Sequence, residues 1–280
     1  MKILVTGVSG QLGHDVCAEL NARGLKNRGV SSRDFNLTDK EAVHSYIKEY
    51  APDAVIHCAA YTAVDKAEDE LEIAHAINTD GTRFIAEICR DLGAKMMYIS
   101  TDYVFPGDGD HYYEPDDQTG PLGAYGKTKL GGELAVQELL GKFFIVRISW
   151  VFGKNGKNFV RTMLKLAETR SELNVVADQI GSPTYTADLA PLLCDMIMTE
   201  KYGIYHATNE GICSWAEFAQ EIFRLAGKNV TVHPIKTSEY PTRAVRPLNS
   251  RMSKDKLSEN GFRRLPEWKD ALERYLKEIE

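Results

Sequence analysis

The chain opens with Lys2-Ile3-Leu4-Val5-Thr6-Gly7-Val8-Ser9-Gly10-Gln11-Leu12-Gly13, and this stretch decides the fold. Its short apolar run predicts a strand that ends at Gly7. Leu12, Val16 and Leu20 recur at four-residue spacing, which predicts a helix directly after the glycines. Three glycines spaced as G-x-x-G-x-x-G therefore lie in the turn between a strand and a helix.

A glycine turn in this position suits a dinucleotide. Glycine adopts positive φ, lets a pyrophosphate approach the backbone closely and lets the helix pack tightly on the strand. The first turn of the helix offers unpaired N–H groups and partial positive charge to the phosphates. Three spaced glycines alone would also fit a plain tight turn, but their place between a strand and a helix predicts dinucleotide binding.

The residues after the predicted second strand bear on the choice of dinucleotide. An NAD site usually has an acidic residue for the ribose hydroxyls about 20 residues beyond the glycines. Here the chain reads Ser31-Ser32-Arg33, and hydroxyls with a guanidinium suit a 2′-phosphate better than a carboxylate does. A solvated turn would explain the same residues. We therefore expect NADPH as the cofactor and leave NADH open.

The alternation of strand and helix continues through the first half of the chain. The run at 54–59 is mostly apolar, as in strands that are buried on both faces. Repeated β–α alternation predicts an α/β fold: a doubly wound parallel Rossmann-type sheet with helices on both faces. The predicted strands are 3–5, 29–31, 54–59, 95–100 and 143–148.

Beyond about Trp150 the pattern becomes irregular, with helical segments, one alternating run and several prolines. We expect a dinucleotide-binding domain over 1–150 and a smaller mixed α/β C-terminal substrate lobe over most of 151–280, with part of 184–200 packing back on the first domain. Two capping-box spacings predict helix starts: Thr38 with Glu41, and Ser214 with Glu217.

Tyr125 and Lys129 carry the candidate chemistry. At i and i+4 they share one face of a predicted helix, and a nearby ammonium group favours the phenolate and lowers the pKa of a tyrosine. Such a pair can exchange a proton with a carbonyl oxygen. Alone it would be read as surface packing, but Thr101 adds a hydroxyl at the end of a predicted strand, at the edge where such folds bind ligands.

Composition narrows the class of protein. The 280 residues carry 34 Lys plus Arg and 40 Asp plus Glu, a formal net charge of −6, which argues against a general nucleic-acid binder or a polybasic membrane binder. The five cysteines include no CxxC pair, so neither a disulfide framework nor a zinc site is expected. No apolar run reaches the ~18 residues of a spanning helix. We expect a cytoplasmic protein.

Longer runs of sequence resemble a known family. Together with the glycine turn and the Tyr-x-x-x-Lys pair, they are similar to the dTDP-4-dehydrorhamnose reductase family, within the extended short-chain dehydrogenase/reductase superfamily. The resemblance spans nearly the whole chain. Its runs are CAAYTAVDKAE at 58–68, STDYVFPG at 100–107, RISWVFG at 147–153, NFVRTM at 158–163, DQIGSPT at 178–184 and RPLNS at 246–250.

The resemblance implies a reaction and its residues. It implies NADPH-dependent reduction of the C4 keto group of dTDP-4-dehydro-6-deoxy-L-mannose to dTDP-L-rhamnose. Tyr125 would donate the proton, Lys129 would hold the nicotinamide ribose and tune Tyr125, and Thr101 would hydrogen-bond the sugar carbonyl. Asp102 and Trp150 would contact the deoxysugar.

The resemblance also implies the cofactor contacts. Asn36 and Leu37 would lie beside the adenine; many relatives carry Asp at the position of Asn36, and Asn still accepts a hydrogen bond. The remaining contacts, besides Ser31, Ser32, Arg33, Tyr125 and Lys129, would be Gly7, Gly10, Gln11, Leu12, Gly13, Ala59, Ala60, Tyr61 and Thr62.

Two points stay open at this stage. Some relatives bind Mg²⁺ at a dimer interface through glutamates, but His14 and Asp15 stand near that position here, so we predict no metal site and leave monomer or homodimer, and any need for Mg²⁺, undecided. The dTDP diphosphate needs cations, and Arg246 lies in a Pro-rich loop with Arg243 and Arg251, which could equally be solvated.

Two other functions fit parts of the pattern. One is a reductase or epimerase of another nucleotide sugar. The other is a non-catalytic subunit resembling the regulatory partner of methionine adenosyltransferase. The presence of Thr101, Tyr125 and Lys129 together argues against the second, because a regulatory subunit does not need all three. His57, in the predicted third strand, is expected to be a core residue with its polar atoms satisfied.

Overall fold

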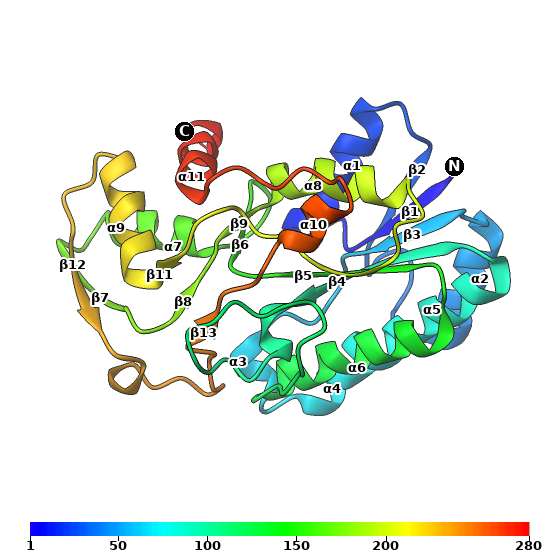
Figure 1. Ribbon diagram of the computed structural model, residues 1–280, viewed down its shortest axis with the longest axis horizontal. Coiled ribbons are helices and arrows are strands. Elements are labelled where there is room, and N and C mark those ends of the chain that lie inside the picture. The colour runs from blue at the N-terminus through cyan, green and yellow to red at the C-terminus, as the bar shows by residue number, and fades with distance from the viewer. Residues whose placement is uncertain (280) are drawn as a thin grey trace.

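A six-stranded parallel sheet forms the centre of the computed structural model, which describes residues 1–279 (Figure 1). Its strand order is β10-β5-β4-β3-β1-β2, and every neighbouring pair is parallel. The order turns outward in both directions from the middle strands, so the predicted doubly wound sheet is confirmed. The strands are β1 Ile3–Thr6, β2 Asn27–Val30, β3 Ala54–His57, β4 Lys95–Thr101, β5 Phe143–Ile148 and β10 Gly203–His206.

Helices cover both faces of this sheet. On one face lie α1 (Gln11–Ala22) and α8 (Thr186–Ile197), which pack on each other. On the other lie α2 (Lys40–Tyr50), α5 (Gly81–Leu92) and α6 (Ala124–Leu139), and the two groups stand on opposite sides of the strands in Figure 1. Two apolar cores result, which explains why the strands read as nearly continuous apolar runs.

The chain leaves the large sheet after β5 and later returns to it. Residues 186–206 supply α8, which packs on α1, and β10, which pairs with β5. Before this return, the chain makes β6 Val151–Phe152, α7 Phe159–Leu166, β7 Glu172–Val176, β8 Ile180–Gly181 and β9 Thr184–Tyr185.

A smaller lobe with its own apolar core lies beside the sheet, at the left of Figure 1. Its helices α7, α9 and α11 enclose an aromatic cluster that includes Phe152, Phe218 and Trp268. Its strands form short two- and three-stranded sheets. The remaining elements of this lobe are β11 Cys213–Ser214, α9 Trp215–Leu225, β12 Thr231–Ile235, η3 Thr237–Glu239, β13 Asn249–Ser250 and α11 Trp268–Ile279.

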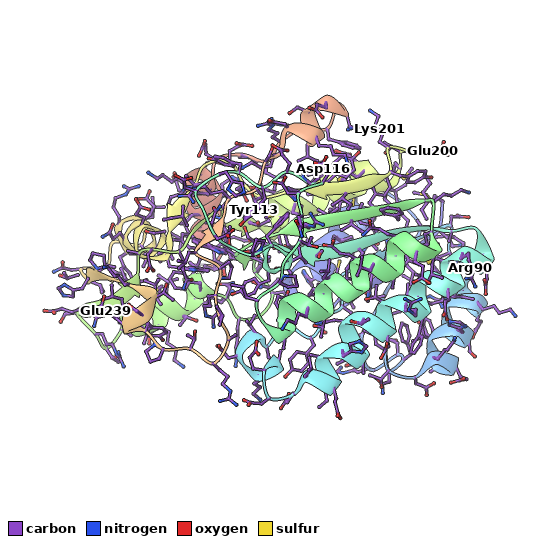
Figure 2. The ribbon with its side chains drawn as sticks, turned by 60° about the horizontal axis from the view of Figure 1, so that its bottom comes forward. Arg90, Tyr113, Asp116, Glu200, Lys201 and Glu239 are labelled. Carbon is purple, nitrogen blue, oxygen red and sulfur yellow. The ribbon has the colours of Figure 1, made fainter. Side chains whose placement is uncertain are left out.

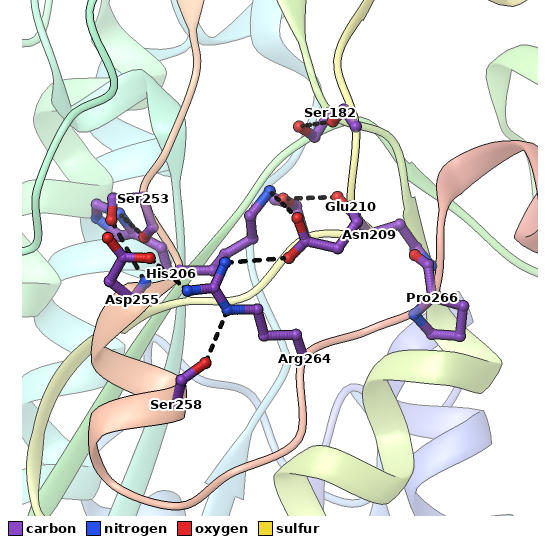
Figure 3. A network of polar contacts seen from close by, with 12 residues as sticks. Ser182, His206, Asn209, Glu210, Ser253, Asp255, Ser258, Arg264 and Pro266 are labelled. Carbon is purple, nitrogen blue, oxygen red and sulfur yellow. Dashed lines mark hydrogen bonds and ion pairs between the residues drawn. The ribbon is translucent and has the colours of Figure 1, made fainter.

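Two segments tie the lobe to the sheet. The loop 105–123, in which Figure 2 labels Tyr113 and Asp116, pairs with the segment after β13: the Tyr113 N–H donates to the Arg251 carbonyl at 2.9 Å. Residues 253–266, with α10 (Asp255–Glu259), are held by the network in Figure 3, where Arg264 donates to Ser258 Oγ at 2.8 Å and pairs with Asp255 and Glu210.

The structure tests the two predicted capping boxes and the predicted burial of His57. Ser214 and Glu217 form the predicted capping box of α9. The prediction that Thr38 caps the second helix was wrong, because the Asp39 side chain accepts from the Ala42 N–H at 3.0 Å and takes the cap one residue later. Buried His57 is hydrogen-bonded to Thr6 Oγ1 at 2.7 Å and Thr82 Oγ1 at 3.2 Å, which confirms it as a satisfied core residue.

Short helices complete the part of the chain that the structure describes. They are α3 Val64–Ala67, α4 Leu71–His75, the π-helical turn η1 Ala76–Asp80 and the 3-10 turn η2 Asp102–Val104. Across residues 1–279, no helix has the length and apolar character needed to cross a membrane. All five cysteines are free thiols.

Candidate active site

A cavity of about 640 Å³ opens at the carboxyl edge of the central sheet. The loops that follow β1, β2, β3, β4 and β5 all reach it, together with the start of α6. This is the edge at which open parallel sheets bind ligands, because the strand order reverses there and the flanking loops separate. The apolar part of its lining exceeds the polar part, so a few polar groups define its chemistry.

The glycine turn forms one end of this cavity, and its backbone needs glycine. Gly7 has φ +74°, and a Cβ there would lie 2.6 Å from the Ala59 nitrogen. A Cβ on Gly13 would lie 2.4 Å from the Gly7 carbonyl oxygen, so α1 packs against the turn too closely for a side chain. The turn and the start of α1 thus form the close-packed cradle that a pyrophosphate requires.

Most residues predicted to contact a cofactor line the same cavity. The exceptions are Arg33, which is exposed, Lys129, which is buried behind the wall, and Tyr61. The Tyr61 hydroxyl donates to the Glu70 carboxylate, while its N–H donates to Asn78 Oδ1 at 2.8 Å. The predicted residues that line the cavity are Gly7, Gly10, Gln11, Leu12, Gly13, Ser31, Ser32, Asn36, Leu37, Ala59, Ala60, Thr62 and Tyr125.

Tyr125, Thr101 and Asp102 meet further along the cavity wall. Tyr125 comes from the first turn of α6, and Thr101 and Asp102 come from the end of β4 and the turn after it. Lys129 lies one turn below Tyr125, fully buried, and its Nζ donates to the Ile99 carbonyl at 2.7 Å. The same Nζ lies 4.0 Å from the centre of the Tyr98 ring, which stabilises a buried cation.

Burial dominates the pKa values at this wall. Burial raises the pKa of Tyr125, and the Thr101 hydroxyl opposes that rise, while the tuning of Tyr125 by Lys129 stays a prediction. Lys129 itself has its pKa lowered to about 7 by burial, with Glu133 opposing that fall. Tyr125 is therefore a neutral phenol, the form that can donate a proton.

Asp102 and Trp150 flank the phenol. Asp102 is buried, and burial raises its pKa to about 6, although hydrogen bonds from Ser250 and Thr101 oppose that rise. Trp150 also lines the cavity and has φ +50°, a left-handed backbone conformation that is strained in a residue other than glycine. Its indole stacks on that of Trp215.

The structure does not bring Arg246 to the cavity lining. Its guanidinium pairs with Asp65 at 2.6 Å and donates to the Tyr103 hydroxyl at 3.1 Å. Arg243 pairs with Asp69, and Arg251 donates to Asn249 Oδ1 at 2.9 Å. The three arginines of the Pro-rich loop are thus engaged with partners of this chain.

The loop after β6 was missed by the sequence reasoning. Asn155, Gly156 and Lys157 line the cavity beside the glycine turn. Asn155 Nδ2 donates to the carbonyls of Ser9 and Gly10, each at 3.1 Å. The Gly-Lys-Asn-Gly-Lys-Asn run at 153–158, between a strand and a helix, was the sequence signal that could have found this loop.

Among residues 1–279, no group of three His, Cys, Asp or Glu side chains is arranged to hold an ion. His14 and Asp15 are hydrogen-bonded to each other at 3.1 Å.

Comparison with known proteins gives the family. The family model described as RmlD substrate binding domain matches residues 1–280. The chain belongs to this family.

Individual members are similar over their whole length. The spore coat polysaccharide biosynthesis protein SpsK of Bacillus subtilis is 43% identical over 277 residues, 99% of this chain and 97% of that protein. The crystal structure of a dTDP-4-dehydrorhamnose reductase from Clostridium acetobutylicum has a TM-score of 0.97 and 42% identity, covering 100% of this chain and 99% of that one. The Bacillus anthracis dTDP-4-dehydrorhamnose reductase, solved in complex with NADP, has a TM-score of 0.96 and 44% identity, with 99% of both chains covered.

Proposed function

We propose that this protein reduces the C4 keto group of dTDP-4-dehydro-6-deoxy-L-mannose to give dTDP-L-rhamnose, with NADPH as the reductant. The observation that carries the proposal is the meeting of Tyr125 and Thr101 in one cavity whose far end is the glycine turn. Such a cavity places a proton donor within the length of a dinucleotide from a phosphate cradle. Two structural relatives with more than 40% identity are named dTDP-4-dehydrorhamnose reductases, which supports this substrate.

The residues of the cavity have different roles in the reduction. NADPH, when bound, supplies the hydride. Tyr125 donates its phenolic proton to the carbonyl oxygen as negative charge develops there, and the Thr101 hydroxyl stabilises the same oxygen. The raised pKa of Tyr125 keeps the proton on the phenol until the substrate oxygen can accept it. Lys129 would hold the nicotinamide ribose from the next turn of α6 once its Nζ, which donates to the Ile99 carbonyl at 2.7 Å, turns toward the cavity.

The preference for NADPH rests on Ser31, Ser32 and Arg33. The two serines line the cavity beyond β2, and the Arg33 side chain is exposed next to them, where it can reach a 2′-phosphate. The NADP complex of the Bacillus anthracis relative supports the same cofactor. A comparison of kcat/KM for NADPH and NADH tests this part, and a clear preference for NADH contradicts it.

The sugar nucleotide takes the other end of the cavity, between Asp102 and Trp150. Its diphosphate needs a cation, and Arg246 is the candidate because its guanidinium donates to the hydroxyl of Tyr103, which lines the cavity. The five cysteines are free thiols, which is consistent with our further proposal that the protein acts in a reducing cytoplasm.

The decisive experiment is a coupled assay. dTDP-glucose is converted by a 4,6-dehydratase and an epimerase to the keto sugar, this protein is added, and NADPH loss is followed while the product is identified. Formation of dTDP-L-rhamnose supports the proposal. Turnover only with a different nucleotide sugar replaces the substrate, and no turnover with any keto sugar, together with a change in a partner enzyme's kinetics, supports a regulatory subunit instead.

A further inference from the structure

Ser250 reaches the active site from the smaller lobe without lining the cavity. Its Oγ donates to Asp102 Oδ2 at 2.5 Å, and both side chains are buried, with 2% and 3% of their surface exposed. The two residues lie 148 positions apart in the chain. The other carboxylate oxygen, Asp102 Oδ1, accepts from the Thr101 hydroxyl at 2.9 Å. Both oxygens of this carboxylate therefore have a fixed donor.

The backbone around Ser250 holds it in place from two sides. The N–H groups of Leu248 and Asn249 donate to the Gly107 carbonyl at 3.0 and 2.9 Å, in the loop just after Asp102. Ser250 itself pairs with Gly181 of β8, and a Cβ on Gly181 would lie 2.9 Å from the Ser250 Cβ and 3.0 Å from the Trp150 ring. Ser250 is thus fixed by packing and backbone bonds that are independent of any ligand.

The direction of the Thr101 hydroxyl depends on this arrangement. The Thr101 hydroxyl donates its proton to Asp102, so the lone pairs of the Thr101 oxygen point in other directions. That oxygen accepts a hydrogen bond from the Tyr103 N–H at 3.3 Å. The same hydroxyl lines the cavity together with Tyr125, and it opposes the rise in the pKa of that phenol. If the Asp102 carboxylate rotated, Thr101 would lose its orienting partner next to the proton donor.

We propose that Ser250 is a positioning residue of the reduction, which acts through Asp102 to fix the Thr101 hydroxyl beside Tyr125. This inference rests on the proposed reduction, in which the Thr101 hydroxyl turns its single proton from Asp102 to the carbonyl oxygen that Tyr125 protonates. The smaller lobe thereby supplies one hydrogen bond to the catalytic wall.

The charges around Asp102 are few. Tyr103 on its own turn and Tyr125 on α6 are the titratable side chains that interact with it, and Arg246 reaches it only through Tyr103. The packed strands β8 and β13 consist of Ile180, Gly181, Asn249 and Ser250, which carry no charge. Removing the Ser250 donor therefore raises the pKa of Asp102 above its value of about 6 with little compensation.

The first test compares Ser250→Ala with Ser182→Ala. Ser182, labelled in Figure 3, is an equally buried serine whose Oγ donates to the Gly211 carbonyl at 2.7 Å and not to Asp102. S250A is expected to lower kcat/KM about tenfold and to move the acid limb of its pH profile upward, since it removes a hydrogen bond to a charged group. S182A is expected to leave that limb in place. Lys129 titrates in the same range, so the variants are compared with wild type at each pH.

A second measurement needs no substrate. The Asp102 carboxyl carbon is titrated by NMR in the free protein, and S250A is expected to raise its midpoint while S182A does not. Ser250→Cys has a side chain of nearly the same size but a weaker donor, so it is expected to shift the Asp102 midpoint by less than S250A does. It replaces S250A in this experiment if S250A fails to fold. An unshifted midpoint in both Ser250 variants overturns the role of Ser250. An inactive wild-type protein with the shift intact overturns the proposed reduction instead.

Discussion

The indole of Trp150 stacks on the indole of Trp215, with ring centroids 3.8 Å apart and planes inclined by 16°. Trp215 begins α9 of the smaller lobe, and its Nε1 donates to Gln179 Oε1 at 3.1 Å, which fixes the plane of its ring. Trp150 follows β5 of the large sheet in a strained left-handed conformation and lines the cavity. The two lobes therefore set the orientation of Trp150 together.

Replacing Trp215 with Ala should weaken substrate binding. A stacked aromatic pair contributes about 0.5–1.5 kcal/mol beyond its buried area, so we expect KM for the sugar nucleotide to rise about three- to tenfold. Dissociation constants for NADPH should not change, because Trp215 does not line the cavity. Steady-state kinetics check the first expectation and fluorescence titration the second. Trp215→Phe keeps a stacking ring, so its KM for the sugar nucleotide should rise less. An unchanged KM in the Ala variant would show that the stacking on Trp150 does not contribute to substrate binding.

Replacing Tyr125 with Phe should remove the proton donor and little else. The loss of a general acid lowers the rate by on the order of 10²–10⁴, so we expect kcat to fall by that factor while NADPH still binds. Tyr46→Phe makes the same chemical change on α2, outside the cavity lining, and should keep near-normal turnover. Near-normal kcat in Tyr125→Phe would show that another group donates the proton.

Replacing Gly13 with Ala should disrupt the phosphate cradle. The new Cβ would lie 2.4 Å from the Gly7 carbonyl oxygen, so α1 must move away from the turn that holds the pyrophosphate. We expect the Kd for NADPH to rise at least about tenfold, because the helix N-terminus and the close approach act together. Gly141→Ala is the matched control, since a Cβ there meets nothing within 4 Å. Equal affinity of the two variants in a binding titration would contradict the assigned cradle.

Much of the fold was predictable because its signals are local. The glycine turn, the Tyr125–Lys129 pair and the capping box at Ser214 each lie within a few residues, where spacing alone determines which groups meet. The same reasoning located most of the cavity lining, since the carboxyl ends of parallel strands share one edge.

What escaped prediction depends on contacts between distant segments. The pairing of Arg246 with Asp65 joins residues that stand 181 positions apart, and no pattern near either residue indicates it. The pKa of Tyr125 also depends on distant packing: sequence spacing shows that Lys129 is near, whereas the largest effect on that pKa, burial, follows from the packing of the whole site. Burial of a helix face is a property of the assembled fold.

A buried ion pair joins α6 to the sheet beneath the active site, and breaking it should destabilise the protein. Arg147 of β5 donates to both carboxylate oxygens of Glu133 at 2.9 and 2.7 Å, and both side chains are buried. Glu133→Ala leaves the guanidinium uncompensated, so we expect a loss of about 3–5 kcal/mol in the free energy of unfolding.

Urea denaturation measures the loss expected for Glu133→Ala. The control is Glu138→Ala on the same helix, whose pair with Arg83 is exposed and should matter little. If both variants unfold at the same urea concentration, the buried pair does not stabilise the fold.

The buried histidines should make the protein sensitive to mild acid. Burial lowers the pKa of His57 to about 3, from 6.5, and lowers that of His206 well below its ordinary value. Below pH 6.5 the unfolded chain takes up a proton on His57 that the folded chain refuses until about pH 3, so stability falls as the pH drops through this window. Between pH 7 and pH 5 the His57 contribution is about 2 kcal/mol.

Urea denaturation at pH 7, 6 and 5 measures that slope. His57→Gln removes the titrating ring, so we expect it to be less stable than wild type at pH 7 but to lose about 2 kcal/mol less on going to pH 5. His233→Gln, at an exposed ring that pairs with Glu172, is the control for removing a histidine outside the core. Parallel slopes for wild type and His57→Gln would mean that His57 accepts a proton in the folded protein as readily as in the unfolded chain.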